Sequence, residues 1–173
     1  VREQLGPIDL LVNNAGIASS TPHDELPFAT WKRMFEVNVD GPFLTTWAVK
    51  DEMLERGTGS MVMISSIAAL RAREKQIHYA SAKAGVIAMT RCCAEGFARD
   101  GVRINCIAPG LIDTEMAYVL TSEHMKTIMA GTPMGRMGKP EEIAELACFL
   151  LSYRASFMTG QTVVASGGRC TLP

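Results

Sequence analysis

Four short apolar runs, separated by stretches of helical composition, constrain the fold more than any other feature of the sequence. The runs are IDLLVNNAG (8–16), SMVMISS (60–66), VRINCIA (102–108) and GQTVVASGG (160–168). Short apolar runs that end in Asn, Ser, Pro or Gly are typical of strands buried on both faces. Strands that alternate with helices indicate an α/β domain built on a parallel sheet.

The stretches between these runs predict helices. Residues 22–56 have helical composition, with Pro27 as an early breaker and a bend at Gly41-Pro42. A long helix is expected over 78–99, and another over 140–153.

The segment 111–139 is rich in glycine and methionine and predicts a mobile lid. Its methionines would suit an apolar substrate chain, although methionine at helical spacing is more often part of a core. The eleven methionines of the chain are therefore expected to fill the core for the most part.

Composition excludes several classes of protein. The 173 residues, 47% hydrophobic and 20% charged, are those of one globular domain, 1–173, with a core. The net charge of −1 gives no field for nucleic acid, and no apolar run approaches the roughly 18 residues that cross a membrane. The five cysteines and three histidines lack zinc-site spacing. No metal is expected, and the thiols are expected to be reduced and mostly buried, as in a cytoplasmic protein.

Polar and small residues end the predicted strands, where ligands collect on a parallel sheet. They are Asn13–Gly16, Ser65-Ser66 and Pro109-Gly110. Tyr79 begins the helix after Ser66, and Lys83 follows one turn later. A phenol titrates near about 10, and a cation one turn away favours the phenolate. Each piece alone is also compatible with a turn, a strand end or an ordinary helix.

In this order and spacing, the residues resemble the short-chain dehydrogenase/reductase family from Val1 to about Gly168. The resemblance rests on four motifs and a serine thirteen residues before the tyrosine: NNAG (13–16), NVDG (38–41), YASAK (79–83) and PGLIDTEM (109–116). The stretch TPMGRMGKPEEIAELACFLLS (132–152) is most similar to 3-oxoacyl-acyl carrier protein reductases, and it is shared with sugar dehydrogenases.

The resemblance implies four catalytic residues. Tyr79 would be the general acid in ketone reduction and the base in alcohol oxidation. Lys83 would lower the pKa of Tyr79 and hold the nicotinamide ribose. Ser66 would bind the substrate carbonyl beside Tyr79, and Asn38 would anchor a water in the proton relay.

The resemblance also implies a dinucleotide cofactor, NADP or NAD, with NADP favoured. Asn14, Ala15 and Gly16 would line its adenosine side. Ile112 would contact the nicotinamide carboxamide through its backbone, with Thr114 nearby. Tyr79 and Lys83 would complete the cofactor site.

The chain departs from the family in lacking the glycine-rich turn that follows the family's first strand. The implied fold is therefore a Rossmann-like, doubly wound parallel sheet without its first strands, and the sequence is expected to be the C-terminal catalytic portion of a longer enzyme. The strand within 8–16 would then be an exposed apolar edge. We expect the 173 residues alone to bind NAD(P)H at least about a hundredfold more weakly than a completed chain, and to show no measurable turnover.

Three functions stay open at this point. The first is reduction of a ketone or acyl thioester, as in 3-oxoacyl-acyl carrier protein reductases. The second is oxidation of a sugar or another alcohol within the same family. The third is a truncated binding or assembly module without turnover, because family members are usually tetramers built through the two long helices and the last strand.

Overall fold

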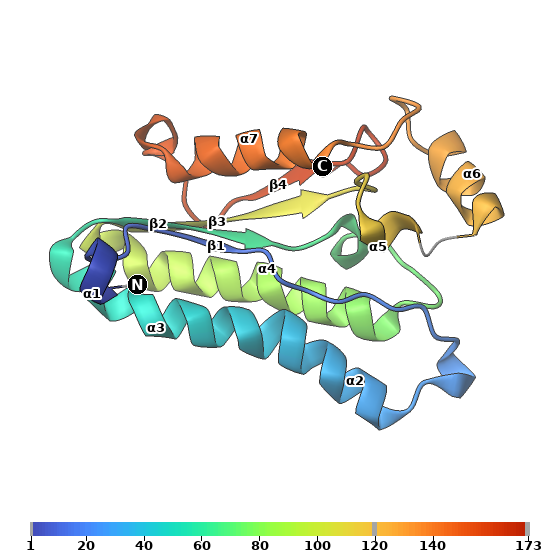
Figure 1. Ribbon diagram of the computed structural model, residues 1–173, viewed down its shortest axis with the longest axis horizontal. Helices are drawn as coiled ribbons and strands as arrows, with labels where there is room; N and C mark the ends of the chain where they lie inside the picture. The colour runs from blue at the N-terminus through green and yellow to red at the C-terminus, as the bar shows by residue number, and fades with distance from the viewer. Residues whose placement is uncertain (1, 119–120, 172–173) are drawn as a thin grey trace.

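A four-stranded parallel sheet forms the centre of the molecule (Figure 1). The structure, a computed structural model, describes residues 2–118 and 121–171. The strands are β1 (Leu10–Asn13), β2 (Gly59–Ile64), β3 (Val102–Pro109) and β4 (Thr162–Ala165), and they lie side by side in chain order. The α/β parallel sheet predicted from the sequence is confirmed.

Helices cover both faces of this sheet. Figure 1 shows α3 and α4 on one face and α7 on the other, and α7 packs on β2 and β3. The helices are α1 (Arg2–Leu5), α2 (Phe28–Phe35), α3 (Gly41–Arg56), α4 (Ile77–Phe97), α5 (Glu115–Tyr118), α6 (Ser122–Ala130) and α7 (Pro140–Leu151). The sheet is therefore doubly wound, as expected.

Two apolar clusters hold the layers together. Met53, Met61 and Met63 are fully buried in the cluster between β2, β3, α3 and α4. The second cluster joins β2 and β3 to α7 through Val62, Ile107 and Leu150, among others. Both faces of β2 and β3 are thus dry, which explains their continuous apolar sequences.

The first strand departs from the sequence prediction. It was expected to be buried on both faces, but Leu10 and Val12 are 55% and 44% exposed. Leu10 and Val12 share one face of the sheet, since side chains alternate along a strand. Leu11 points to the other face and packs into the cluster between the sheet and helices α3 and α4. β1 lies at the edge of the sheet, so the expected exposed apolar edge is confirmed.

Two helical boundaries also differ from prediction. The helix expected from residue 22 begins at Phe28, after a 3-10 turn at His23–Glu25, because Pro27 holds an extended conformation at its start. The expected bend is a π-helical segment over Glu36–Asp40, which joins α2 to α3 without a break.

The segment 111–139 contains two short helices, α5 and α6, that the sequence analysis did not predict. Ala117 and Ile128 of these helices are buried. The expectation of mostly buried thiols is wrong: Cys93 and Cys106 are buried, whereas Cys92 and Cys148 are exposed and Cys170 is partly exposed.

Candidate active site

A cavity of about 1190 Å³ opens at the carboxyl ends of the strands. It is lined by all nine residues that the sequence singled out: Asn14, Ala15, Gly16, Asn38, Ser66, Tyr79, Lys83, Ile112 and Thr114. These residues come from the ends of three strands, the π-helical segment and α4. The fold therefore brings together positions that are up to 100 residues apart in the chain.

The end of β2 and the start of α4 are tied to each other by buried hydrogen bonds. The Ser65 hydroxyl donates to the backbone carbonyl of Lys83 at 2.8 Å, and Lys83 Nζ donates to the carbonyl of Ile64 at 3.0 Å. These two bonds fix the position of the Lys83 ammonium relative to the strand end. The lysine is only 5% exposed.

Burial changes the chemistry of Lys83. It lowers the pKa of the ammonium to about 8, because the charged form loses solvation. At neutral pH the group is still mostly protonated, so it can donate hydrogen bonds or bias a neighbouring phenol. Its Nζ lies 5.9 Å from the centroid of the Tyr79 ring.

Tyr79 responds to several neighbours at once. Burial raises the pKa of its phenol, while the Ser66 side chain and the positive charge of Arg73 act in the opposite direction. The sequence analysis had assigned no role to Arg73, whose charge lowers the pKa of this phenol. A tuning role for Lys83 stays a prediction for the cofactor-bound enzyme.

Ser66 caps a 3-10 turn after β2. Its hydroxyl oxygen accepts from the backbone N–H of Ala68 at 3.1 Å. That bond orients the side chain and uses one of its acceptor sites, so the hydroxyl proton can be donated elsewhere. Ser66 and Tyr79 line the same cavity, and the Ser66 side chain is close enough to lower the pKa of the Tyr79 phenol.

Asn38 lies in the π-helical segment, fully buried. Pro42 has no N–H to offer to the carbonyl of Asn38 four residues earlier, which disfavours a regular α-helix here. The Asn38 amide nitrogen donates to the carbonyls of Ile17 and Met34, both at 3.0 Å. Its amide oxygen has no partner among the described residues, although it is buried.

Gly16 leaves an open space beside both this oxygen and the Lys83 ammonium. A Cβ at position 16 would lie 2.7 Å from Asn38 Oδ1 and 3.2 Å from Lys83 Nζ. Only glycine leaves that space open. A buried acceptor, an ammonium and a bare backbone thus meet at one point of the cavity. This combination suits a ribose hydroxyl or an ordered water, so the residues present fit the nicotinamide end of a dinucleotide.

The loop after β3 is held in place at two points. The Gly110 N–H donates to the carbonyl of Ala165 at 2.8 Å, and a Cβ on Gly110 would lie 2.8 Å from the Ser166 backbone. Ile112 forms a bridge with Gly138, whose N–H donates to the Leu111 carbonyl at 3.0 Å. The backbone of Ile112 is therefore fixed where the nicotinamide contact is predicted.

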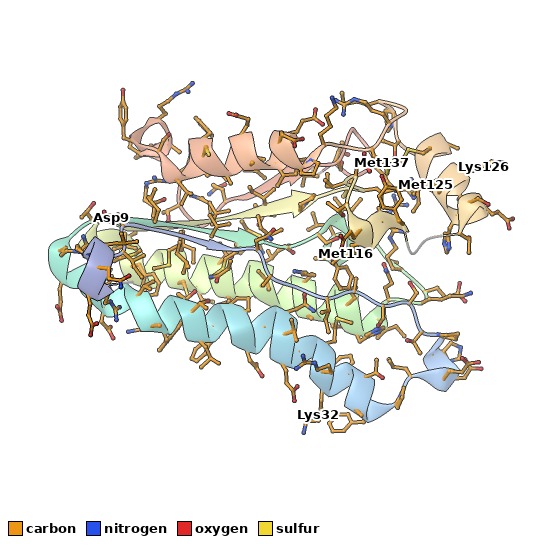
Figure 2. The ribbon with its side chains drawn as sticks, in the orientation of Figure 1. Asp9, Lys32, Met116, Met125, Lys126 and Met137 are labelled. Atoms are coloured by element: carbon orange, nitrogen blue, oxygen red, sulfur yellow. The ribbon has the colours of Figure 1, made fainter. Side chains whose placement is uncertain are left out.

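The outer part of the cavity contains residues that sequence reasoning missed. Arg73 comes from the loop between β2 and α4, and Arg169 follows β4. Met116 of α5 also lines the cavity and is 48% exposed. Figure 2 labels Met116, Met125 and Met137 around α5 and α6, at the end of the molecule where the strands finish. Asp9 lies at the opposite end of the molecule, and Lys32 lies on the outer side of α2.

Two other kinds of site are not found within residues 2–118 and 121–171. None of their helices combines the length and hydropathy that a membrane crossing requires. In the same ranges, no group of three or more His, Cys, Asp or Glu side chains is arranged to hold a metal ion.

Comparison with known proteins finds relatives over nearly the whole chain. A family model described as Enoyl-(Acyl carrier protein) reductase matches residues 1–169. The 3-oxoacyl-[acyl-carrier-protein] reductase of Thermotoga maritima is 38% identical over 168 residues, which cover 97% of this chain and 68% of the relative.

Solved structures give the same result. A 7α-hydroxysteroid dehydrogenase in complex with NADH and 7-oxo glycochenodeoxycholic acid superposes with a TM-score of 0.92 at 38% identity, over 96% of this chain and 66% of the other. A gluconate 5-dehydrogenase of Burkholderia cenocepacia, in complex with NADP and tartrate, superposes with a TM-score of 0.93 at 35% identity, over 97% and 67% of the two chains.

Proposed function

Because this chain belongs to the short-chain dehydrogenase/reductase family, we propose that it interconverts a ketone and a secondary alcohol with NADP or NAD. The observation that carries the proposal is the meeting of Ser66, Tyr79, Lys83 and Asn38 around one cavity. The likeness to the Thermotoga maritima reductase favours a 3-oxoacyl thioester or a related ketone as substrate.

In the proposed reaction, Ser66 and Tyr79 share the substrate oxygen. Ser66 donates a hydrogen bond to the carbonyl, and Tyr79 donates the proton that turns it into a hydroxyl. The nicotinamide, when bound, supplies or accepts the hydride. In the reverse direction Tyr79 accepts the hydroxyl proton, which requires a lowered phenol pKa.

Lys83 and Asn38 serve the cofactor and the proton supply. The buried ammonium of Lys83 holds the nicotinamide ribose, beside the space that Gly16 leaves open. The unpartnered oxygen of Asn38 accepts a hydrogen bond from a water. That water takes part in the relay that returns a proton to Tyr79. Asn14, Ala15, Ile112 and Thr114 complete the cofactor side.

A sugar-acid or related alcohol dehydrogenase is the second candidate. The likeness to the gluconate 5-dehydrogenase favours it, because the similarity extends over 97% of this chain. The non-catalytic assembly module has less support, since it would not need a buried lysine whose pKa lies near 8.

We also propose a cytoplasmic homo-tetramer. Five free cysteines suit a reducing compartment. Phe43, Leu44 and Trp47 of α3 are exposed by 39% to 64%, and such an apolar strip suits contact with another subunit.

The test is oxidation of NADPH and of NADH in the presence of acetoacetyl-CoA, methyl acetoacetate and 5-keto-gluconate. It should use the protein as its gene encodes it, with the 173-residue chain measured alongside. We expect turnover of at least one ketone and its loss in Ser66→Ala. No turnover with any pairing of these cofactors and ketones would contradict the proposal.

A further inference from the structure

Three arginines come together where the loop before α4 meets the segment after β4, and two of them line the outer part of the cavity. Arg71 and Arg73 belong to the loop before α4, and Arg169 follows β4. Arg71 Nη1 donates to the backbone carbonyl of Arg169 at 3.3 Å, which brings the two segments together. Arg73 and Arg169 line the cavity with Ser66 and Tyr79.

The guanidinium groups of Arg73 and Arg169 have hydrogen bonds left to make. The Nε of each is buried and has no partner within the described part of the chain. Arg169 Nη1 donates to the carbonyl of Ile128, but no side-chain hydrogen bond is found for Arg73 in the same part. Buried donors without acceptors are unfavourable, and most proteins satisfy them.

Within residues 2–118 and 121–171, no acidic side chain pairs with the positive charges of the cluster. Five ion pairs are present elsewhere in residues 2–118 and 121–171, and none of them includes Arg71, Arg73 or Arg169. Glu74 and Glu115 line the cavity without pairing to these arginines. Burial first, then the charges of Arg73 and Arg71, lower the pKa of Arg169. The arginines therefore repel one another in the ligand-free protein.

We infer that Arg73 and Arg169 bind a carboxylate on the substrate, a few bonds from its reacting carbonyl. The preferred substrates are then oxo acids and hydroxy acids, rather than neutral ketones. A carboxylate supplies the acceptors that two guanidinium groups need, and Arg binds it in a planar, two-pronged geometry. Arg73 and Arg169 line the same cavity as Ser66 and Tyr79, so one substrate can place its carbonyl at the tyrosine and its carboxylate at the arginines. This inference rests on the proposed function and, within it, replaces the thioester by a free oxo acid as the preferred ketone.

An anionic group could also come from the phosphates of a coenzyme A thioester. Three forms of one ketone separate these sources: acetoacetate carries the carboxylate, methyl acetoacetate is neutral, and acetoacetyl-CoA carries distant phosphates. The measured quantity is kcat/KM with NADPH and with NADH, on the protein as its gene encodes it. We expect acetoacetate to exceed the methyl ester by at least about tenfold.

Substitution then locates the preference. Arg73→Gln and Arg169→Gln should each lower the ratio of kcat/KM for acetoacetate to that for the ester by about tenfold. The ratio cancels any effect of Arg73 on Tyr79, which acts on both substrates. Arg91→Gln, an exposed arginine of α4, is the matched control and should leave the ratio unchanged.

Two results would overturn the inference and leave the proposed oxidoreductase function intact. One is equal kcat/KM for acetoacetate and its methyl ester. The other is a preference for acetoacetyl-CoA that Arg73→Gln and Arg169→Gln abolish. If no ketone is turned over, the proposed function fails, and calorimetric titration with acetoacetate still decides the inference. Binding that Arg73→Gln and Arg169→Gln abolish would support it. Absence of binding to the unsubstituted protein, or binding unaffected by both variants, would overturn it.

Discussion

The inner and outer parts of the cavity are built in different ways. The inner part, defined by Asn38, Ser66, Tyr79 and Lys83, stands on strand ends and helices whose side chains bond to the backbone. The outer part, defined by Arg73, Met116 and Arg169, stands on loops and a four-residue helix. Its arginines keep unfilled donors. From this difference we expect the side chains of the inner part to hold their positions before a ligand binds. We expect the outer part to select the ligand.

The largest effect should come from the inner part. Tyr79→Phe keeps the ring and removes only the acidic proton, so we expect kcat to fall by about a thousandfold. The cofactor dissociation constant should stay within about threefold of its original value. Steady-state kinetics and fluorescence titration measure the two quantities.

Tyr153→Phe is the control, because Tyr153 is 87% exposed and lies outside the cavity. It should leave kcat unchanged. A decrease of less than about tenfold in Tyr79→Phe would show that another group donates the proton, and that the inner part is not the acid–base centre.

Lys83→Met should weaken the cofactor and stabilise the free protein. Burial lowers the pKa of Lys83 from 10.5 to about 8, so folding is opposed below pH 8, where the folded chain must keep a buried charge. This free-energy penalty decreases as the pH rises from the folded-state pKa of about 8 to the unfolded-state pKa of 10.5. We expect a gain of up to about 3 kcal/mol at pH 7 that vanishes near pH 10.5.

Urea unfolding of both proteins at the two pH values measures this difference. The same substitution should shift the pH profile of alcohol oxidation toward alkaline pH, because a cation near the phenol is lost. An equal gain in the free energy of unfolding at both pH values would mean that Lys83→Met improves packing and removes no charge penalty. An unshifted profile would limit Lys83 to holding the ribose.

Gly16→Ala tests whether the open space beside Asn38 Oδ1 and Lys83 Nζ is needed for activity. The new Cβ would lie 2.7 Å from Asn38 Oδ1, so we expect the amide to be displaced and kcat/KM to fall by about tenfold. Gly96→Ala is the matched control, since a Cβ there meets nothing within 4 Å and the glycine lies within α4. It should raise stability by roughly 0.5–1 kcal/mol without changing activity. Unchanged kcat/KM in Gly16→Ala would remove the need for this close approach.

The smallest effect concerns the sheet edge, away from the chemistry. Leu10→Lys places a charge on the exposed strand β1, where Leu10 is 55% exposed. We expect less self-association by light scattering and an unchanged melting temperature. Leu5→Lys, at an 81% exposed position of α1, is the control and should change neither. Equal scattering in all three proteins would show that β1 does not drive association.

The inner part could be predicted from the sequence, and the outer part could not. Asn38, Ser66, Tyr79 and Lys83 occur in ordered motifs, because strand ends and the first turn of a helix fix where such residues lie. Arg73 and Arg169 are 96 positions apart, and no periodicity links two loops. The short helices α5 and α6 were missed because glycine and methionine in 111–139 suggested irregular structure. The exposure of β1 followed from its place at the sheet edge, which apolar composition alone does not show.

The central claim is that the inner part transfers a proton to a ketone while the nicotinamide supplies the hydride. The most direct test uses NADPH, and in parallel NADH, deuterated at the transferring position of the ring. The protein as its gene encodes it is incubated with the preferred ketone, and the alcohol is analysed by mass spectrometry. We predict one deuterium on the carbon that bears the new hydroxyl, and formation of the same labelled alcohol about a thousandfold more slowly by Tyr79→Phe. An alcohol without deuterium, or equal labelling by Tyr79→Phe at the same rate, would contradict the account.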